Sequence, residues 1–322
     1  MEKVVKLDLY DKKLLYELDK KSNIGLNELA KKLRKSKQFV LYRIKRLEDE
    51  NVITSYTAIV DMSKLGYFTF RVYLKLQHMT EDDKKEMIEF VKNNKKQVWT
   101  ITAMHGKWDI ALFLGVRTIM EFHQIWEDVM LRYKKNIPMY NVSIYAPIFN
   151  FNRRFFFDAA EEPLMRIYGD GSKEDYDELD WKIIQLYATN VRQSSLEIAK
   201  KLGITADTVR SRIKKLEAKK ILCGYKIGIN LDKLGYTSYR VDLQLSSSAK
   251  DKSLFEFCRM HKNIYQINKS IGGSDFELEV IVKDLNELIQ IIDEIRTKFK
   301  DVVNDVDYFA FSTFHVLQFI PD

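Results

Sequence analysis

The segment ELAKKLRKSKQFVLYRIKRLE, residues Glu28–Glu48, recurs farther along the chain as EIAKKLGITADTVRSRIKKLE, residues Glu197–Glu217. The similarity continues downstream, where KLGYFTFRVYL (Lys64–Leu74) matches KLGYTSYRVDL (Lys233–Leu243). A repeat this long indicates duplication of one folding unit, whereas a solenoid requires several short repeats. We therefore predict two tandem copies of one unit in this chain of 322 residues.

The first part of each copy has the apolar periodicity of three short helices. In the first copy, a second helix over residues 26–33 is followed by a turn and by Ser36, a suitable N-cap for the third helix, and Thr205 has the same place in the second copy. The third helix keeps one apolar face, which consists of Val40, Ile44 and Leu47 in the first copy and of Val209, Ile213 and Leu216 in the second. Three helices followed by a wing-like hairpin are typical of a winged helix-turn-helix.

The second part of each copy alternates strand and helix patterns in the order βαββαβ, which is typical of a ferredoxin-like domain. The final strand is unusually aromatic in both copies, with NFNRRFFF at Asn150–Phe157 and FAFSTFHVLQF at Phe309–Phe319. Because such a strand is apolar on both faces, we expect it to cross to the sister half or to another subunit. Burial of both faces within one domain is the alternative.

These patterns predict an α+β fold with five segments. The segments are a winged helix-turn-helix at 1–62, a ferredoxin-like domain at 63–157, a linker at 158–175, a second winged helix-turn-helix at 176–231 and a second ferredoxin-like domain at 232–322.

The chain carries 53 Lys and Arg against 46 Asp and Glu, which gives a net charge of +7. This basic balance permits a polyanionic partner. Two cysteines, Cys223 and Cys258, exclude a disulfide framework and a four-cysteine zinc site. We see neither a secretory signal nor an apolar run long enough to span a membrane. The expectation is a soluble, cytoplasmic protein with no membrane partner.

At this point the sequence resembles the Lrp/AsnC family of transcription regulators, also called feast/famine regulators. The matching marks are ELAKKL in the second helix, VLYRIKRLEDENVI (Val40–Ile53), the LGY at Leu65–Tyr67 and the loop Gly106–Asp109. The resemblance implies a DNA-binding unit followed by a sensing domain, called the RAM domain, that self-associates. Members ordinarily carry one such unit, so two in one chain suggest a covalent pseudo-dimer with its sensing sheets packed on each other. A dimer of such chains remains open.

Basic residues concentrate on and beside the third helix of each copy, where they would neutralise phosphates of double-stranded DNA. We predict the following DNA-binding residues: Lys35, Ser36, Lys37, Gln38, Leu41, Tyr42, Arg43, Lys45, Arg46, Thr205, Asp207, Arg210, Ser211, Arg212, Lys214 and Lys215. Arg43 and Arg212 flank the apolar face, so contact with phosphate and pairing with a nearby carboxylate both remain open.

The outward residues of the two third helices differ. Gln38 in the first suits adenine, whereas Arg210 and Asp207 in the second suit guanine and cytosine. We therefore predict two unlike half-sites. Alternatively, one helix reads the bases and the other only clamps the duplex.

The loop between the two central strands of each sensing domain is a candidate site for an amino-acid-like effector, as the resemblance implies. Its residues are His105, Gly106, Trp108 and Asp109 in the first copy and Gly272, Gly273, Ser274 and Asp275 in the second. The aspartates could bind an ammonium group. They could equally close hydrogen bonds to their own backbone.

The sequence contains no Walker phosphate loop, no HExxH zinc motif and no GxSxG nucleophile motif. The five histidines are dispersed, so we expect no metal, no cofactor and no enzymatic activity. Two alternatives remain open. One is an architectural DNA-binding protein without an effector. The other is an enzyme like the siroheme decarboxylases, which share this architecture and would use histidine and arginine around the inter-sheet cleft; His105 is the histidine near that place.

Overall fold

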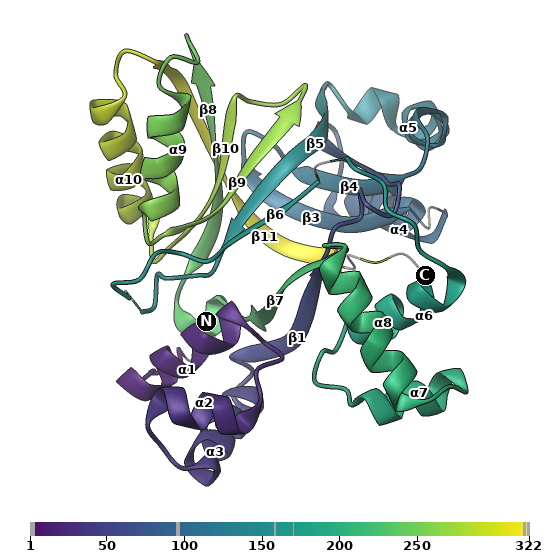
Figure 1. Cartoon of the computed structure of the whole chain (residues 1–322). Coiled ribbons are helices and arrows are strands. Elements are labelled where there is room, and N and C mark those ends of the chain that lie inside the picture. The colour runs from purple at the N-terminus through teal and green to yellow at the C-terminus, as the bar shows by residue number, and fades with distance from the viewer. Residues whose placement is uncertain (1–3, 95–96, 158, 170, 318–319, 321–322) are drawn as a thin grey trace.

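The computed structural model describes residues 4–94, 97–157, 159–169, 171–317 and 320. Two layers stand one above the other (Figure 1). The upper layer is a β-barrel covered by helices, and the lower layer holds two helix-turn-helix units joined by a two-stranded ribbon. Among the described residues, no helix is long and apolar enough to cross a membrane.

Each helix-turn-helix unit contains three helices with local start signals in the sequence. The first unit consists of α1 (Leu9–Lys20), α2 (Leu26–Leu33) and α3 (Lys37–Asp49), and the second of α6 (Glu178–Tyr187), α7 (Ser195–Leu202) and α8 (Ala206–Ala218). The Ser36 hydroxyl accepts a hydrogen bond from the Phe39 N–H at 3.2 Å, and the Thr205 hydroxyl accepts one from the Thr208 N–H at 3.1 Å. Both residues therefore cap the helices that they were predicted to cap.

The strand that follows each third helix does not form a hairpin within its own unit, which corrects the expected hairpin. Instead β1 (Ile53–Val60) pairs antiparallel with β7 (Leu222–Ile229) of the other unit, with Tyr56 opposite Ile227. The two strands lie next to each other, and each supplies the backbone N–H and C=O groups that complete the hydrogen bonds of the other. The ribbon therefore ties α3 and α8 to one shared element.

Eight strands close into one barrel. Around the ring they follow the order β2 (Phe68–Lys75), β4 (Ile110–Val116), β3 (Val98–Gly106), β11 (Val303–Leu317), β8 (Thr237–Leu245), β10 (Phe276–Val282), β9 (Ile264–Ile271) and β5 (Met139–Phe151), and β5 pairs again with β2. The two expected sheets therefore join edge to edge and do not stack as separate sheets. Closure pairs the edge strands of the two halves with each other.

The seams of the barrel confirm that each final strand crosses to the other half. The N-terminal half contributes β5, which pairs with β9, and the C-terminal half contributes β11, which pairs with β3. However, β5 ends at Phe151, before the end of the aromatic run. The three phenylalanines 155–157 pack instead on the core of the first helix-turn-helix unit.

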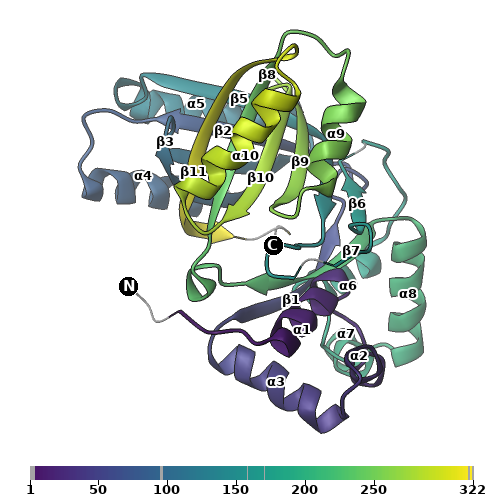
Figure 2. The same cartoon turned by 90° about the vertical axis from the view of Figure 1, so that its left-hand side faces the viewer.

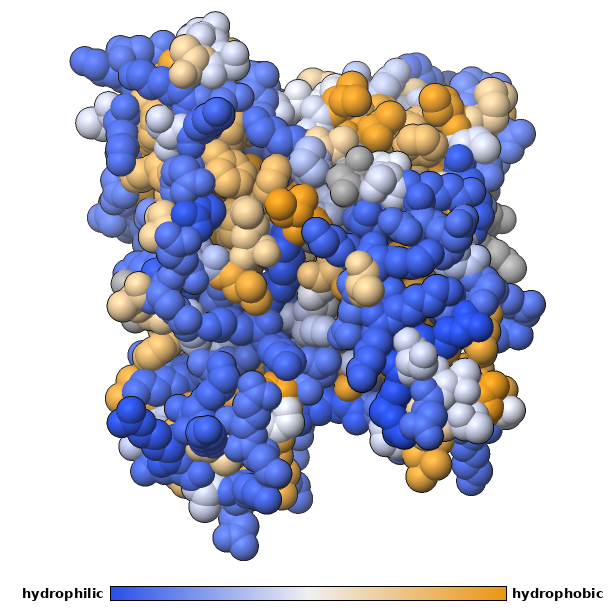
Figure 3. Space-filling model, in the orientation of Figure 1, coloured by the Kyte–Doolittle hydropathy of each residue, from blue (hydrophilic) through white to orange (hydrophobic). Residues whose placement is uncertain are grey.

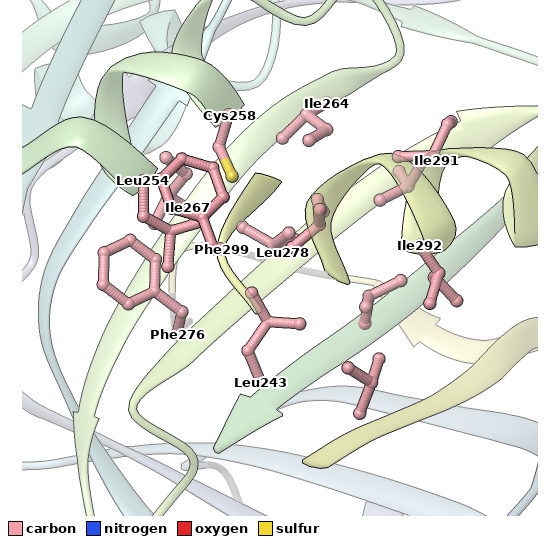
Figure 4. Close-up of a cluster of buried hydrophobic side chains, with 14 of the residues drawn as sticks. Leu243, Leu254, Cys258, Ile264, Ile267, Phe276, Leu278, Ile291, Ile292 and Phe299 are labelled. Carbon is pink, nitrogen blue, oxygen red and sulfur yellow. The ribbon is translucent and has the colours of Figure 1, made fainter. Parts of the chain in front are cut away.

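Helices cover the outside of the barrel in pairs. They are α4 (Glu81–Asn94) and α5 (Ile119–Tyr133) on the N-terminal half, with η1 (Lys134–Asn136) after α5, and α9 (Asp251–Met260) and α10 (Leu285–Lys298) on the C-terminal half, where η2 (Asp232–Leu234) precedes β8. Figure 2 shows α9 and α10 lying across the strands. Their apolar faces meet Leu243, Phe276 and Leu278 in a closed core (Figure 4). Each such buried side chain contributes roughly 1.5–3 kcal/mol.

The inside of the barrel is charged. Glu277 on β10 accepts hydrogen bonds from Arg71 on β2 at 2.5 and 2.6 Å and from Arg240 on β8 at 3.1 Å. All three side chains are at most 1% exposed. Burial alone would raise the pKa of Glu277, but the two guanidiniums outweigh it and lower that pKa. This network connects the two halves across the barrel.

The segment predicted as a linker, 158–175, joins the halves but is not a loose connection. It contains a short strand, β6 (Met165–Tyr168), that pairs with β5. The Arg166 side chain reaches from β6 into the space between the two layers, where it is 4% exposed. The segment therefore contributes to the structure that connects the barrel with the helix-turn-helix layer.

Candidate nucleic-acid interface and internal cavity

The outer face of α3 carries most of the residues predicted to read DNA in the first unit. Leu41 and Tyr42 are 56% and 67% exposed although both are large and apolar or aromatic. Lys37, Gln38 and Lys45 are also exposed on this helix. The face of the first unit seen at the lower left of Figure 3 is largely hydrophilic. This combination of cations, one amide and exposed apolar surface suits contact with phosphates and base edges.

Arg43 and Arg46 point back toward α1 and are held there by carboxylates. Arg43 donates to Asp8 at 2.6 Å and to Asp11 at 3.1 Å, and Arg46 donates to Asp11 at 2.6 Å. Asp11 is fully buried. Of the two possibilities left open for Arg43, the structure therefore shows pairing with a carboxylate. Both arginines position α3 against α1.

The second unit repeats this arrangement. Arg212 donates to Asp177 and, at 3.0 Å, to Asp180, and Lys215 lies 3.5 Å from Asp180. The hydrogen bond from Arg212 lowers the pKa of the Asp177 carboxyl.

On the outer face of α8, Arg210 pairs with Asp207, while Ser211 and Lys214 are exposed. Because of that pair, α8 presents fewer uncompensated cations than α3. Lys35 beside α3, by contrast, is in cation–π contact with the Tyr10 ring, 4.5 Å from its centroid.

The two predicted effector loops lie at the end of β3 and of β9, and their aspartates bind the protein itself. An Asp109 carboxylate oxygen accepts the Leu76 N–H at 2.7 Å and another pairs with Lys75 at 3.1 Å. Asp275 accepts the Leu245 N–H, also at 2.7 Å. Trp108 is buried in an aromatic cluster, whereas His105 and Gly106 are exposed. In the second loop, Ser274 accepts a hydrogen bond from Gln244 at 3.0 Å, next to Gly272 and Gly273.

A cavity of about 990 Å³ lies between the ribbon and the barrel. Its floor is formed by β1 and β7, including Thr57 and Lys226, and its upper wall by barrel residues such as Phe113 and Tyr145. The sequence gives no sign of this cavity because its residues come from many separate segments. The eight residues of the predicted effector loops do not contribute to its lining.

The cavity lining contains more cations than carboxylates. The cations are Arg117, Arg153, Arg166, Lys173 and Lys226, and the carboxylates are Asp19, Asp61 and Glu279. Arg153 is paired with Asp19. Burial lowers the pKa of Lys226 to about 8, and the neighbouring Arg153 adds to that effect. The described part of the lining includes no histidine, and His105 is therefore outside it.

Two winged helix-turn-helix units mounted on a mixed α+β body define a protein of the DNA-binding helix-turn-helix class. Residues 7–54 match the model of a winged helix-turn-helix DNA-binding domain, and residues 177–217 match the AsnC-type helix-turn-helix domain. The chain is 34% identical over 119 residues to the transcriptional regulator LrpA of Pyrococcus horikoshii and 30% identical over 119 residues to the regulator Ptr1 of Methanocaldococcus jannaschii. These matches span 82% and 80% of those proteins but only 36% and 37% of this chain. The chain belongs to the Lrp/AsnC family.

The whole chain also resembles a solved structure of different function. The siroheme decarboxylase NirDL superposes with a TM-score of 0.65 over 97% of this chain and 94% of that chain, at 13% identity. NirDL has also been solved in complex with an iron-uroporphyrin III analogue, and that structure superposes with a TM-score of 0.64. This likeness shows a common fold. It overturns the expectation of no enzymatic activity, which was drawn from missing catalytic motifs and dispersed histidines, because an enzyme has this fold over nearly the whole chain.

Proposed function

We propose that the chain is a sequence-specific transcription regulator that binds double-stranded DNA through both helix-turn-helix units. The exposed face of α3 is the observation that carries this proposal. Leu41 and Tyr42 are large side chains left in solvent beside Lys37, Gln38 and Lys45. An exposed apolar pair among cations is costly for solubility but suits a helix that enters the major groove.

The two units are proposed to recognise unlike half-sites. On α3 the exposed cations supply affinity, and Gln38 supplies base contacts. On α8 the Arg210 guanidinium must leave Asp207 before it can contact guanine, so α8 is the weaker reader. The ribbon fixes both helices to one element and thereby sets the half-site spacing.

The body is proposed to consist of two ferredoxin-like sensing domains from a tandem duplication. In each half the four strands follow the order final, first, third and second, as β5-β2-β4-β3 and β11-β8-β10-β9. The hydrogen bonds of Asp109 and Asp275 to the matching residues Leu76 and Leu245 support the same origin. An amino-acid-like effector at these two loops, and assembly of two such chains, remain part of the proposal.

Selection from a pool of random duplexes tests the regulator. The expected result is an enriched motif with two unlike half-sites about one helical turn apart or a multiple of it. A Tyr42→Ala and Lys45→Ala double variant would lose enrichment, whereas a Lys92→Ala control on α4 would keep it. Salt-sensitive binding without a motif would instead identify an architectural DNA-binding protein.

A porphyrinoid decarboxylase is the second candidate, and the cavity favours it. NirDL, the enzyme of the same fold, has been solved with an iron-uroporphyrin III analogue, a flat ring bearing several carboxylates. Arg153, Arg166 and Lys226 could hold such carboxylates in a cavity of about 990 Å³. Tyr145 and Tyr168 also line it and carry hydroxyl groups that could supply protons.

Anaerobic incubation with siroheme, followed by mass spectrometry of the tetrapyrrole, tests this candidate. Loss of the mass of carbon dioxide in the wild-type chain, and not in a Lys226→Met variant, would support the enzyme. Unchanged siroheme with a demonstrated DNA motif would support the regulator.

A further inference from the structure

The cavity between the ribbon and the barrel touches both layers of the molecule. Its lining includes Thr54 and Thr57 of β1, Lys226 of β7, and residues on every strand of the barrel. The ribbon in turn continues directly from the recognition helices, since β1 begins at Ile53 shortly after α3 and β7 begins shortly after α8. An occupant of the cavity would therefore contact the element that sets the placement of α3 and α8.

Several buried polar groups in the lining have no partner in the described part of the protein. The Arg166 Nε, the Trp99 Nε1 and the Asp61 Oδ2 atoms are buried without a hydrogen bond. These three side chains are 4%, 5% and 1% exposed. A buried polar group without a partner destabilises the folded chain, so each one requires an explanation. The lining therefore contains polar groups whose hydrogen bonding the described part of the protein does not complete.

The charge of Arg166 is not balanced by a direct ion pair within the described residues. Its guanidinium donates to the carbonyl oxygens of Asp19 at 2.6 Å and Tyr225 at 2.8 Å and to the Asn150 side chain at 3.1 Å. Burial lowers the pKa of Arg166 for the same reason that it lowers that of Lys226. An anionic group on a ligand would stabilise both cations.

Aromatic side chains form much of the remaining wall, beside aliphatic ones such as Ile144 and Ile281. The aromatic residues include Trp99, Phe113, Tyr145, Tyr168, Phe311 and Phe314. Flat faces of this kind favour planar ring systems through stacking. The excess of cations over carboxylates in the same lining selects a negative charge on that ring.

We propose that this cavity is a second regulatory site, in addition to the proposed loop sites, and that a planar, aromatic anion bound there changes DNA affinity by altering the ribbon. The site is distinct from the loops around Asp109 and Asp275, whose carboxylates are engaged by the protein. The inference rests on the proposed DNA-binding function. A ligand acts in this way only if it binds one arrangement of the ribbon more tightly than another. The ratio of those two affinities is the upper limit of its effect on DNA affinity, and DNA changes the affinity for the ligand by the same factor as the ligand changes the affinity for DNA.

The fluorescent anion 8-anilinonaphthalene-1-sulfonate serves as the probe, with the full-length chain and the DNA motif obtained by selection. We expect saturable binding that weakens at least about 10-fold in Lys226→Met, which keeps the side-chain volume and removes the charge. Phe314→Ala removes a wall residue that is 48% exposed, so it provides a second test that does not disturb the core. Lys92→Met is the matched control, because it removes one positive charge from an exposed pair with Glu89.

DNA affinity is then measured with and without saturating probe at constant salt. The expected result is a change of at least about 5-fold in the wild-type chain and in Lys92→Met, and little change in Lys226→Met and Phe314→Ala. Probe binding that is equal in all four proteins, or DNA affinity that does not respond to bound probe, would overturn the inference. If the chain binds no DNA even without probe, the proposed DNA-binding function itself is refuted. If it binds DNA but does not respond to the probe, only the regulatory site is refuted.

Discussion

The substitution Glu277→Gln tests whether the buried ion network holds the barrel together. Among the described residues, Glu277 is the one carboxylate that bonds to both Arg71 and Arg240, and it also accepts hydrogen bonds from the Ser270 hydroxyl and the Ser274 N–H at 2.8 and 3.2 Å. A glutamine has nearly the same volume. It leaves Arg71 without a charged partner among the described residues, leaves Arg240 with only Glu279 at 3.5 Å, and turns an N–H₂ group toward a guanidinium.

Removal of one partner from a buried ion pair costs about 3–5 kcal/mol. For a chain of this size that corresponds to a fall in the thermal midpoint of roughly 10 °C. Far-UV circular dichroism melts at neutral pH measure this midpoint. Glu86→Gln is the control, since Glu86 is 64% exposed in its pair with Arg132 and its loss should move the midpoint by no more than about 2 °C.

The difference between wild type and Glu277→Gln should also depend on pH. The folded-state pKa of Glu277 lies below its ordinary value of 4.5, so the contribution of its charge is complete above that value. It is lost as the pH falls through the lower folded-state pKa. Equal midpoints for the two proteins at neutral pH would refute the role assigned to the network.

Three further predictions concern single cations. Lys45→Ala should reduce the slope of log affinity for DNA against log salt by about 1 without changing the melting temperature, because Lys45 is exposed on the face of α3 that we propose contacts DNA phosphate. Arg43→Ala should instead lower stability by about 1–3 kcal/mol in urea titrations, because its partner Asp11 is buried; a stable variant with weakened DNA binding would contradict this. Affinity for the anionic probe should fall as the pH rises through about 8, where Lys226 loses its proton, and stay flat in Lys226→Met. In the unfolded chain Lys226 has the ordinary lysine pKa of 10.5. Because the unfolded chain then binds this proton more readily than the folded chain, the free energy of unfolding should rise between about pH 8 and pH 10.5, which denaturant titrations measure.

Local features of this fold could be predicted from the sequence. The caps Ser36 and Thr205 and the helices after them depend on neighbouring residues only, and the structure has them where the pattern indicated. The strand and helix order of each half followed from periodicity in the same way. The crossing of β11 could be inferred because an aromatic strand needs cover on both faces, whereas the part of β5 that crosses, Ile144–Asn150, mostly precedes the aromatic run used for the same inference.

Features that depend on distant pairing could not be predicted in the same way. Nothing near β1 indicates that its partner is β7, and the expectation of a hairpin within each unit was therefore wrong. The closed barrel required two edge pairings between halves, for which residue patterns carry no register information. The cavity was missed because Arg166, Lys226 and Trp99 come from three separate segments. For the loops, the sequence left ligand binding and backbone bonding open for Asp109, and the structure shows the backbone bond.

Binding to a pool of random duplex DNA across a salt series tests the central claim most directly. We predict an enriched motif with two unlike half-sites, affinity that falls steeply as salt rises, and loss of both in the Tyr42→Ala and Lys45→Ala double variant. No measurable binding by the folded wild-type chain at low salt would contradict it.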